Sequence, residues 1–170
     1  MHVVLQLGDR IVYGIHGVCA IIDIEQRVID RKKADYYVLE PLDQPGAKYY
    51  VPTQNQIAVS KLRPMLTKDE LEALFLNPSC RENIWIPDEG RRKLRYRELI
   101  NGGDRTALIC MIRCLNQHKE SQLAAGRKFH LCDENFLKDA KKVLNSEFSY
   151  VLGIPTGEVG AYLENKISNL

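Results

Sequence analysis

The spacing of apolar side chains along the chain changes near residue 64. Before that point, short runs rich in Val, Ile and Tyr alternate with Gly, Asp and Asn, as in β-strands joined by tight turns. The runs are "RIVYG" at 10–14, "VCAIIDIE" at 18–25, "DYYVLEP" at 35–41, "KYYVP" at 48–52 and "IAVSKL" at 57–62. Because five such strands are too few for a sandwich, they predict a small Tudor- or SH3-like β-barrel over residues 1–66.

From Thr67 onward the apolar residues recur at helical spacing. Thr67 and Glu70 form a capping-box pattern ahead of a short apolar stripe that Pro78 ends. Later start and stop signals predict a helix after Pro87 through Ile100, which Gly102-Gly103 stop. They also predict one helix from the N-cap Asp104, one opening at Asp133, and a last short turn or helix over 159–167. Residues 67–170 are thus predicted to form a helical bundle, which makes the chain an α+β protein.

Composition indicates a soluble protein of a reducing compartment such as the cytoplasm. The five cysteines are odd in number and follow no disulfide-framework spacing, and no signal-peptide or membrane-spanning pattern is present. We therefore expect no membrane partner. The net charge is only +2, so a contact with nucleic acid would need a local basic patch.

No catalytic motif is recognisable in the sequence. It contains no glycine-rich phosphate loop, G-x-S-x-G elbow or HExxH, and His16, His118 and His130 lack partners at a diagnostic spacing. We therefore expect no enzyme activity, no cofactor and no small-molecule substrate.

Several cysteines and histidines have a spacing that raises the question of a metal. Cys110, Cys114 and His118 follow at i, i+4 and i+8 on one predicted helix, with His130 and Cys132 after a loop. Structural zinc usually uses tight C-x2-C pairs, and buried thiols are common on apolar helix faces. Core packing is therefore the favoured interpretation, and we assign no metal ligand.

The only tryptophan, Trp85, stands two residues before Pro87 and just ahead of the densest basic cluster, which includes Arg91, Arg92 and Lys93. Two interpretations are open. The indole could pack between helices while the cations form a solvated helix face. Alternatively, the ring could wedge against a base while the cations hold nearby phosphates.

The strand "KYYVP" at 48–52 ends in proline, which favours the edge of a sheet. Tyr49 and Tyr50 could simply alternate between the two faces. Alternatively, a partner could add a strand to this edge, and Arg27 could pair with a carboxylate of that partner.

The runs "GDRIVYGIHGVCAIIDIE", "YYVLEP" and "YYVP" resemble the start of CarD-type (CarD/CdnL) bacterial transcription regulators, a module also found in transcription-repair coupling factor. The shared motif falls at Gly8, Asp9, Val12, Tyr13, His16, Gly17 and Val18. At Gly14 many family members have proline. The resemblance continues through Trp85, "GGD" at 102–104 and "AKKVLNSEF" at 140–148, which favours CarD over a repair factor.

The resemblance implies a non-enzymatic, nucleoid-associated regulator of transcription initiation. Residues 1–66 would form a Tudor-like domain that binds the RNA polymerase β subunit by strand pairing, through Arg27, Tyr49, Tyr50 and Val51. Residues 67–170 would contact promoter DNA in the minor groove at the upstream fork junction and stabilise the open complex. We take Trp85, Arg91, Arg92 and Lys93 as the DNA-facing residues. The alternative is a protein-interaction adaptor without direct DNA contact.

Overall fold

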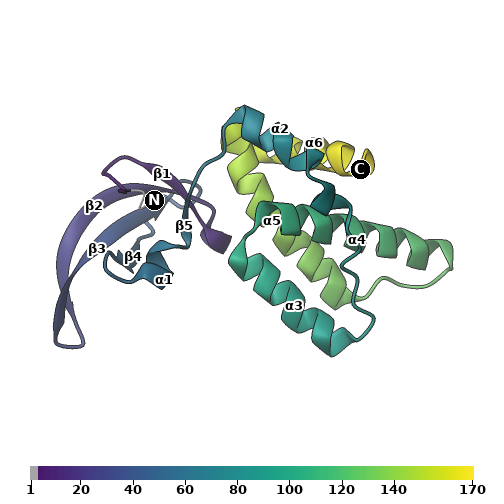
Figure 1. The fold of residues 1–170 in the computed structure, drawn as a ribbon, viewed down its shortest axis with the longest axis horizontal. Helices are drawn as coiled ribbons and strands as arrows, with labels where there is room; N and C mark the ends of the chain where they lie inside the picture. The colour runs from purple at the N-terminus through teal and green to yellow at the C-terminus, as the bar shows by residue number, and fades with distance from the viewer. Residues whose placement is uncertain (1–3) are drawn as a thin grey trace. The chain divides into compact units, whose positions relative to one another are not determined.

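The first part of the chain is built on one antiparallel sheet (Figure 1). The computed structural model describes residues 4–170, and the chain divides into two units, Met1–Met65 and Leu66–Leu170. The strands of the first unit are β1 (Arg10–Tyr13), β2 (Val18–Ile29), β3 (Lys32–Pro41), β4 (Tyr49–Pro52) and β5 (Leu62–Pro64), with a 3-10 turn η1 (Gly14–His16) between β1 and β2. Their order across the sheet is β4-β3-β2-β1-β5.

The α+β class is confirmed, but a closed Tudor- or SH3-like barrel is not. In the part of the chain that the structure describes, β4 and β5 are the two edges of the sheet and do not pair with each other. β2 and β3 instead extend as a long hairpin, whose turn residues Asp30 and Arg31 have left-handed backbone angles. The sheet is therefore open.

The position predicted for the last strand of the first unit was wrong. Residues 57–62 were expected to form it, but a short helix, α1 (Gln56–Val59), precedes β5. Asn55 begins this helix, because its side-chain oxygen accepts a hydrogen bond from the Ala58 N–H at 3.1 Å. The β-branched residues Ile57 and Val59 favoured a strand, and the cap overrides that preference.

One face of the sheet carries the core of the first unit. The side chains that share it are nearly all inaccessible to solvent: Leu5, Ile11, Cys19, Ile21, Leu39, Val51 and Leu62. Val51 reaches this core from β4, where it pairs with Tyr37 of β3.

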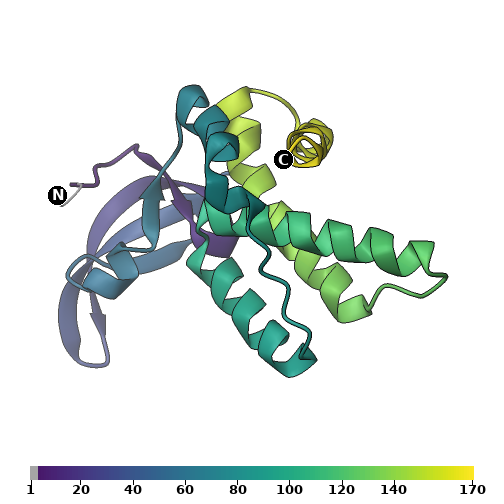
Figure 2. The same ribbon diagram turned by 45° about the vertical axis from the view of Figure 1, so that its right-hand side comes forward.

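The second unit is helical throughout (Figures 1 and 2). Its helices are α2 (Lys68–Leu76), a 3-10 turn η2 (Pro78–Arg81), α3 (Glu89–Gly102), α4 (Arg105–Ala124), α5 (Leu131–Leu152) and α6 (Thr156–Ser168). The Thr67 capping box, the Asp104 N-cap and the left-handed Gly103 are present as predicted. Helix α5 begins at Leu131, two residues before the predicted start, because Asp133 is buried and bonded to another helix.

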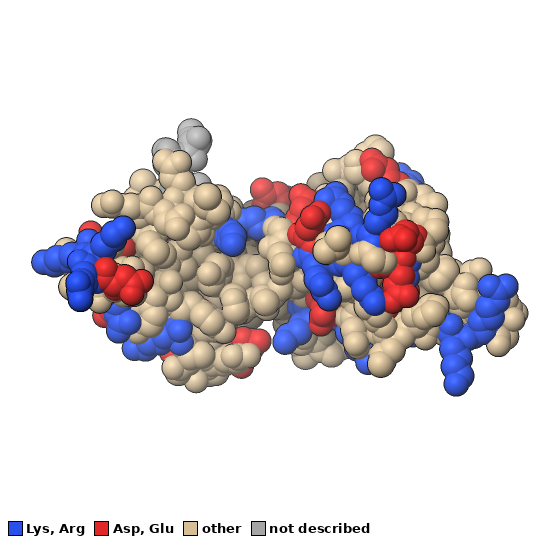
Figure 3. Space-filling view, turned by 90° about the horizontal axis from the view of Figure 1, so that it is seen from below, with Lys and Arg blue, Asp and Glu red and all other residues tan. Residues whose placement is uncertain are grey.

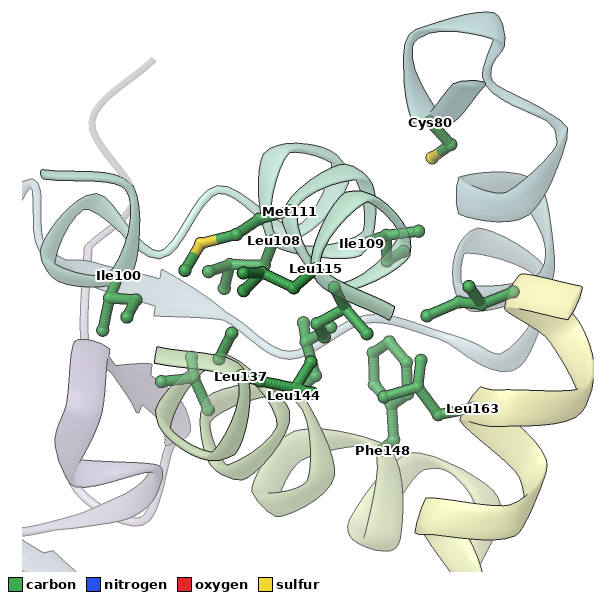
Figure 4. Packing of buried hydrophobic residues seen from close by; sticks show 14 of the residues in the cluster. Cys80, Ile100, Leu108, Ile109, Met111, Leu115, Leu137, Leu144, Phe148 and Leu163 are labelled. Atoms are coloured by element: carbon green, nitrogen blue, oxygen red, sulfur yellow. The ribbon is translucent and has the colours of Figure 1, made fainter. Parts of the chain in front are cut away.

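α4 and α5 supply the centre of the helical core. In Figure 4, Leu108, Met111 and Leu115 of α4 face Leu137 and Leu144 of α5. All of these side chains are at most 3% exposed, and burying each contributes roughly 1.5–3 kcal/mol to folding. This packing fixes the two helices against each other and so fixes the surface they support.

A buried carboxylate holds the first residue of the helical unit. Glu147 on α5 accepts hydrogen bonds from the Arg105 guanidinium, at 2.7 Å for each oxygen, and from the Leu66 N–H at 2.9 Å. Its side chain is 2% exposed. The chain is therefore anchored to the helices immediately after Met65.

We expect Thr67→Ala to lower the free energy of unfolding of the helical unit by about 1 kcal/mol. The Thr67 hydroxyl accepts the Glu70 N–H at 3.2 Å, and alanine leaves that donor without its cap. Urea unfolding followed by helix circular dichroism measures the change. Lys68→Ala, one residue into the same helix, is the matched control, and an equal loss in both variants would contradict the cap.

Candidate functional site

An extended segment, residues 82–86, crosses the surface of α4 on its way to α3. The thiol of Cys110 donates to the Glu82 carbonyl at 3.0 Å, and the Ile84 N–H donates to the Cys114 sulfur at 3.4 Å. Both sulfurs belong to nearly buried side chains. Across residues 4–170, no group of three or more His, Cys, Asp or Glu side chains is placed to hold a metal ion. These two cysteines instead hold the backbone that leads to the tryptophan.

Trp85 lies between two side chains from different helices. The imidazole of His118, one turn beyond Cys114 on α4, stacks on the indole with ring centroids 3.7 Å apart and planes inclined by 23°. The guanidinium carbon of Arg92 on α3 lies 4.3 Å from the indole centroid. The backbone N–H of Trp85 donates to the Asn83 side-chain oxygen at 3.0 Å. The ring is therefore partly buried and firmly oriented at the surface of the helical unit.

Arg92 does not have the surface position expected of a phosphate contact. It is 4% exposed, and its guanidinium donates to both oxygens of Asp133, at 2.9 and 3.0 Å. The same guanidinium also donates to the carbonyls of Ile86 at 2.8 Å and Pro87 at 3.2 Å. The phosphate contact of Arg92 stays a prediction, and it would require these bonds to break first.

The helical repeat explains why Arg92 is buried. Tyr96 and Ile100 follow it at i+4 and i+8, and both are in the core. A row of this kind places Arg92 on the inner face of α3, and Asp133 on α5 is the carboxylate that neutralises it. The apolar spacing of Tyr96 and Ile100 was the signal in the sequence that could have identified this.

The other two predicted cations lie on the outside of α3. Arg91 is exposed, and its backbone N–H donates to the Asp88 side chain that begins the helix, at 2.7 Å. Lys93 forms an ion pair with Glu89 one turn away. Arg91 therefore offers its charge to a ligand more readily than Lys93 does.

Two cations that sequence reasoning missed lie on the connection between α4 and α5. Arg127 and Lys128 are exposed, and no acidic side chain of the described residues pairs with either. Figure 3 shows Lys and Arg side chains gathered at one end of the helical unit. The next residue, Phe129, has its ring 6.2 Å from that of His118, which stacks on Trp85. The connection thus brings positive charge to the neighbourhood of the tryptophan.

His118 stacks on Trp85 as a neutral ring at pH 7. Partial burial lowers its pKa from the usual value, and the nearby positive charge of Arg92 acts in the same direction. Asp133 opposes the shift by favouring the protonated form. Protonation of His118 would place a second cation beside Arg92, which disfavours it.

The edge strand β4 has backbone groups free for a partner. It pairs only with β3, so its other side is unpaired in residues 4–170. Tyr49 packs on His16, with ring centroids 4.1 Å apart. Val51 is 1% exposed and points into the core, so it can contact a partner only through its backbone.

Arg27 and Tyr50 are brought together, although they lie on different strands. The Arg27 guanidinium carbon is 3.9 Å from the centre of the Tyr50 ring, and the same guanidinium pairs with Glu25 at 2.7 Å. The Arg27 side chain is still 42% exposed. A cation stacked on an aromatic ring beside a free strand edge can contact an acidic protein surface.

Comparison with known protein families shows which domain family the first unit matches. Residues 5–63 match the CarD-like/TRCF RID domain. This domain interacts with RNA polymerase, so the match indicates a transcription-associated protein that binds the polymerase. Among curated proteins, none matches the chain.

The RID domain contains every residue proposed for the polymerase contact, from Arg27 to Val51. Trp85 and the cations near it follow the last matched residue, so the match carries no information on DNA. No helix in the described part of the chain is long and apolar enough to cross a membrane.

Proposed function

We propose that this protein is a non-enzymatic, CarD-type regulator of transcription initiation. Its RID domain binds the RNA polymerase β subunit, and its helical unit contacts promoter DNA in the minor groove at the upstream fork junction, where Trp85 stabilises the open complex. The observation that carries the proposal is the combination of a RID domain with a partly exposed, firmly oriented tryptophan in the following unit.

The free edge of β4 supports the polymerase contact. Strand addition at such an edge gains affinity from backbone hydrogen bonds, and side chains beside the edge supply specificity. Arg27 and Tyr50 lie beside it and are accessible.

We expect Arg27→Glu to weaken binding to RNA polymerase β by about tenfold, because it replaces attraction by repulsion at the rim of the contact. Biolayer interferometry with the full chain measures this affinity. Lys33→Glu is the matched control. Lys33 pairs with Val28 across the β2–β3 hairpin, so the two side chains share a face. Because Val28 follows Arg27 directly, Lys33 lies on the face opposite to Arg27. Equal effects of the two variants would show that general charge, and not this face, governs binding.

The DNA contact rests on Trp85 and on the exposed cations Arg91, Arg127 and Lys128. A tryptophan held at the surface can press against a base step where a duplex is already opening. Few cations surround it, so affinity for DNA must be low without the polymerase.

We expect the double variant Arg127→Glu/Lys128→Glu to reduce the salt dependence of DNA binding. Each phosphate contact contributes a slope of about 0.9 in a plot of log affinity against log salt, so the slope should fall by no more than about 2. Fluorescence anisotropy with a forked duplex over a series of salt concentrations measures it. Lys138→Glu/Lys142→Glu, at exposed positions on α5, is the control, and an unchanged slope in the first variant would place the DNA-facing surface elsewhere.

A second candidate function is an adaptor that binds polymerase and a further protein without touching DNA. The observation that favours it is that Trp85 packs partly against the helical core and contacts two side chains. In that case the tryptophan would be structural. The two candidates differ in the effect of removing the indole on open-complex lifetime.

A further inference from the structure

The indole of Trp85 has a protein group over each face. His118 and Arg92 come from different helices, and each lies within 4.3 Å of the ring centroid. Two groups stacked this closely over one ring cannot share a face without crowding each other. The edge of the ring is therefore the part left for a ligand.

From this arrangement we infer that Arg92 and His118 are positioning residues, which hold Trp85 so that it meets DNA with its edge and not with an open face. The inference rests on the proposed DNA contact of Trp85. It also gives Arg92 a different role from the phosphate contact predicted from the sequence.

The hydrogen bonds of Arg92 explain how the position is maintained. Asp133 fixes the guanidinium from α5 through two bonds, and the guanidinium then binds the Ile86 and Pro87 carbonyls directly after Trp85. Cys114 holds the backbone just before the ring. The residues on both sides of the indole, and the indole itself, are thus attached to the helices.

An edge-on ring selects a particular form of DNA. Flat stacking of an unpaired base requires an uncovered aromatic face, which this arrangement does not offer. An edge can enter between two stacked base pairs from the groove, where it separates a step that is already weak. The DNA that fits is therefore a paired but destabilised step at the end of a duplex, rather than a single strand.

The arrangement itself can be tested without DNA, because Trp85 is the only tryptophan. Protonated imidazole quenches an indole in contact with it, so fluorescence should fall as pH is lowered through the titration of His118. The charged and titratable groups that act on His118 are Arg92 from α3, and His130 and Asp133 from the start of α5. We expect the midpoint below the usual histidine pKa, since that pKa is lowered. His118→Gln should abolish the transition, whereas His130→Gln should keep it. A transition that survives His118→Gln would overturn the stacking.

The role in positioning is tested by open-complex lifetime with intact polymerase binding. Arg92→Met/Asp133→Leu replaces the buried ion pair by apolar side chains and so avoids leaving an unpaired charge, which protects the fold. We expect this variant and His118→Gln each to shorten the lifetime by about fivefold, with polymerase affinity unchanged. Lys119→Gln, next to His118, is the control.

If both variants keep the lifetime of the unmodified protein while Trp85→Ala shortens it, the positioning role is overturned and the proposed function stands. An unchanged lifetime in Trp85→Ala would overturn the proposed function and the edge contact, while the fluorescence titration would still decide the stacking.

Discussion

Replacing Trp85 with alanine should shorten the lifetime of open promoter complexes by about ten- to hundredfold while RNA polymerase binding persists. A wedge that helps to separate one base step contributes a few kcal/mol, and about 1.4 kcal/mol corresponds to a factor of ten. Polymerase binding should persist because the RID domain lies in the other unit of the chain. Lifetimes are measured by challenging preformed complexes with a competitor, and polymerase affinity by interferometry on the same preparation.

The folding stability of the same variant separates a wedge from a structural residue. Truncating a fully buried tryptophan costs roughly 3–5 kcal/mol, and we expect a smaller loss because part of Trp85 is exposed. Leu94→Ala is the control, since Leu94 is 63% exposed on the outer face of α3. A fall in melting temperature that matches a full core deletion, or an unchanged lifetime with intact polymerase binding, would favour the adaptor.

Replacing Glu147 with alanine should lower the free energy of unfolding of the helical unit by roughly 3–5 kcal/mol, the cost of breaking a buried ion pair from one side. The Arg105 side chain is 14% exposed, so its ion pair with Glu147 would be lost in a largely dry environment. The Leu66 N–H would lose its acceptor as well. Urea unfolding of the full chain, followed by helix circular dichroism, measures the change.

An exposed ion pair of the same unit provides the contrast. Arg95 and Glu98 are 3.3 Å apart with side chains 55% and 68% exposed, so Glu98→Ala should cost less than about 1 kcal/mol. If the two glutamate variants were equally stable, Glu147 would not be the anchor that its hydrogen bonds indicate.

Helix boundaries were the features most readable from the sequence. Thr67, Asp104 and Gly103 act within four residues of their own position, so local composition is sufficient to recognise them. The start of α5 was misplaced for the opposite reason. Asp is a common N-cap residue, but the Asp133 carboxylate instead accepts a hydrogen bond from Arg92, 41 residues away in the chain.

At the candidate site, contacts between residues far apart in the chain could not be predicted from the sequence. The row of Cys110, Cys114 and His118 was recognised as one helix face, but its neighbour is an extended segment whose path no periodicity reveals. Arg92 was grouped with Arg91 and Lys93 because all three are cations. Their surroundings differ, because Arg92 alone of the three lies on the inner face of α3.

The hydrogen bond between Glu147 and Leu66 has a consequence for how two weak contacts combine. β5 ends at Pro64 and the Leu66 N–H is already held, so Met65 alone joins the two units. Two binding modules on so short a tether experience an effective concentration on the order of millimolar or higher once one of them is engaged, provided that both can reach their targets. Under the proposed function, a helical unit that hardly binds free DNA would still be occupied at a promoter. Binding to the polymerase would raise the local concentration of the helical unit at the promoter, so that few phosphate contacts would be enough for DNA binding.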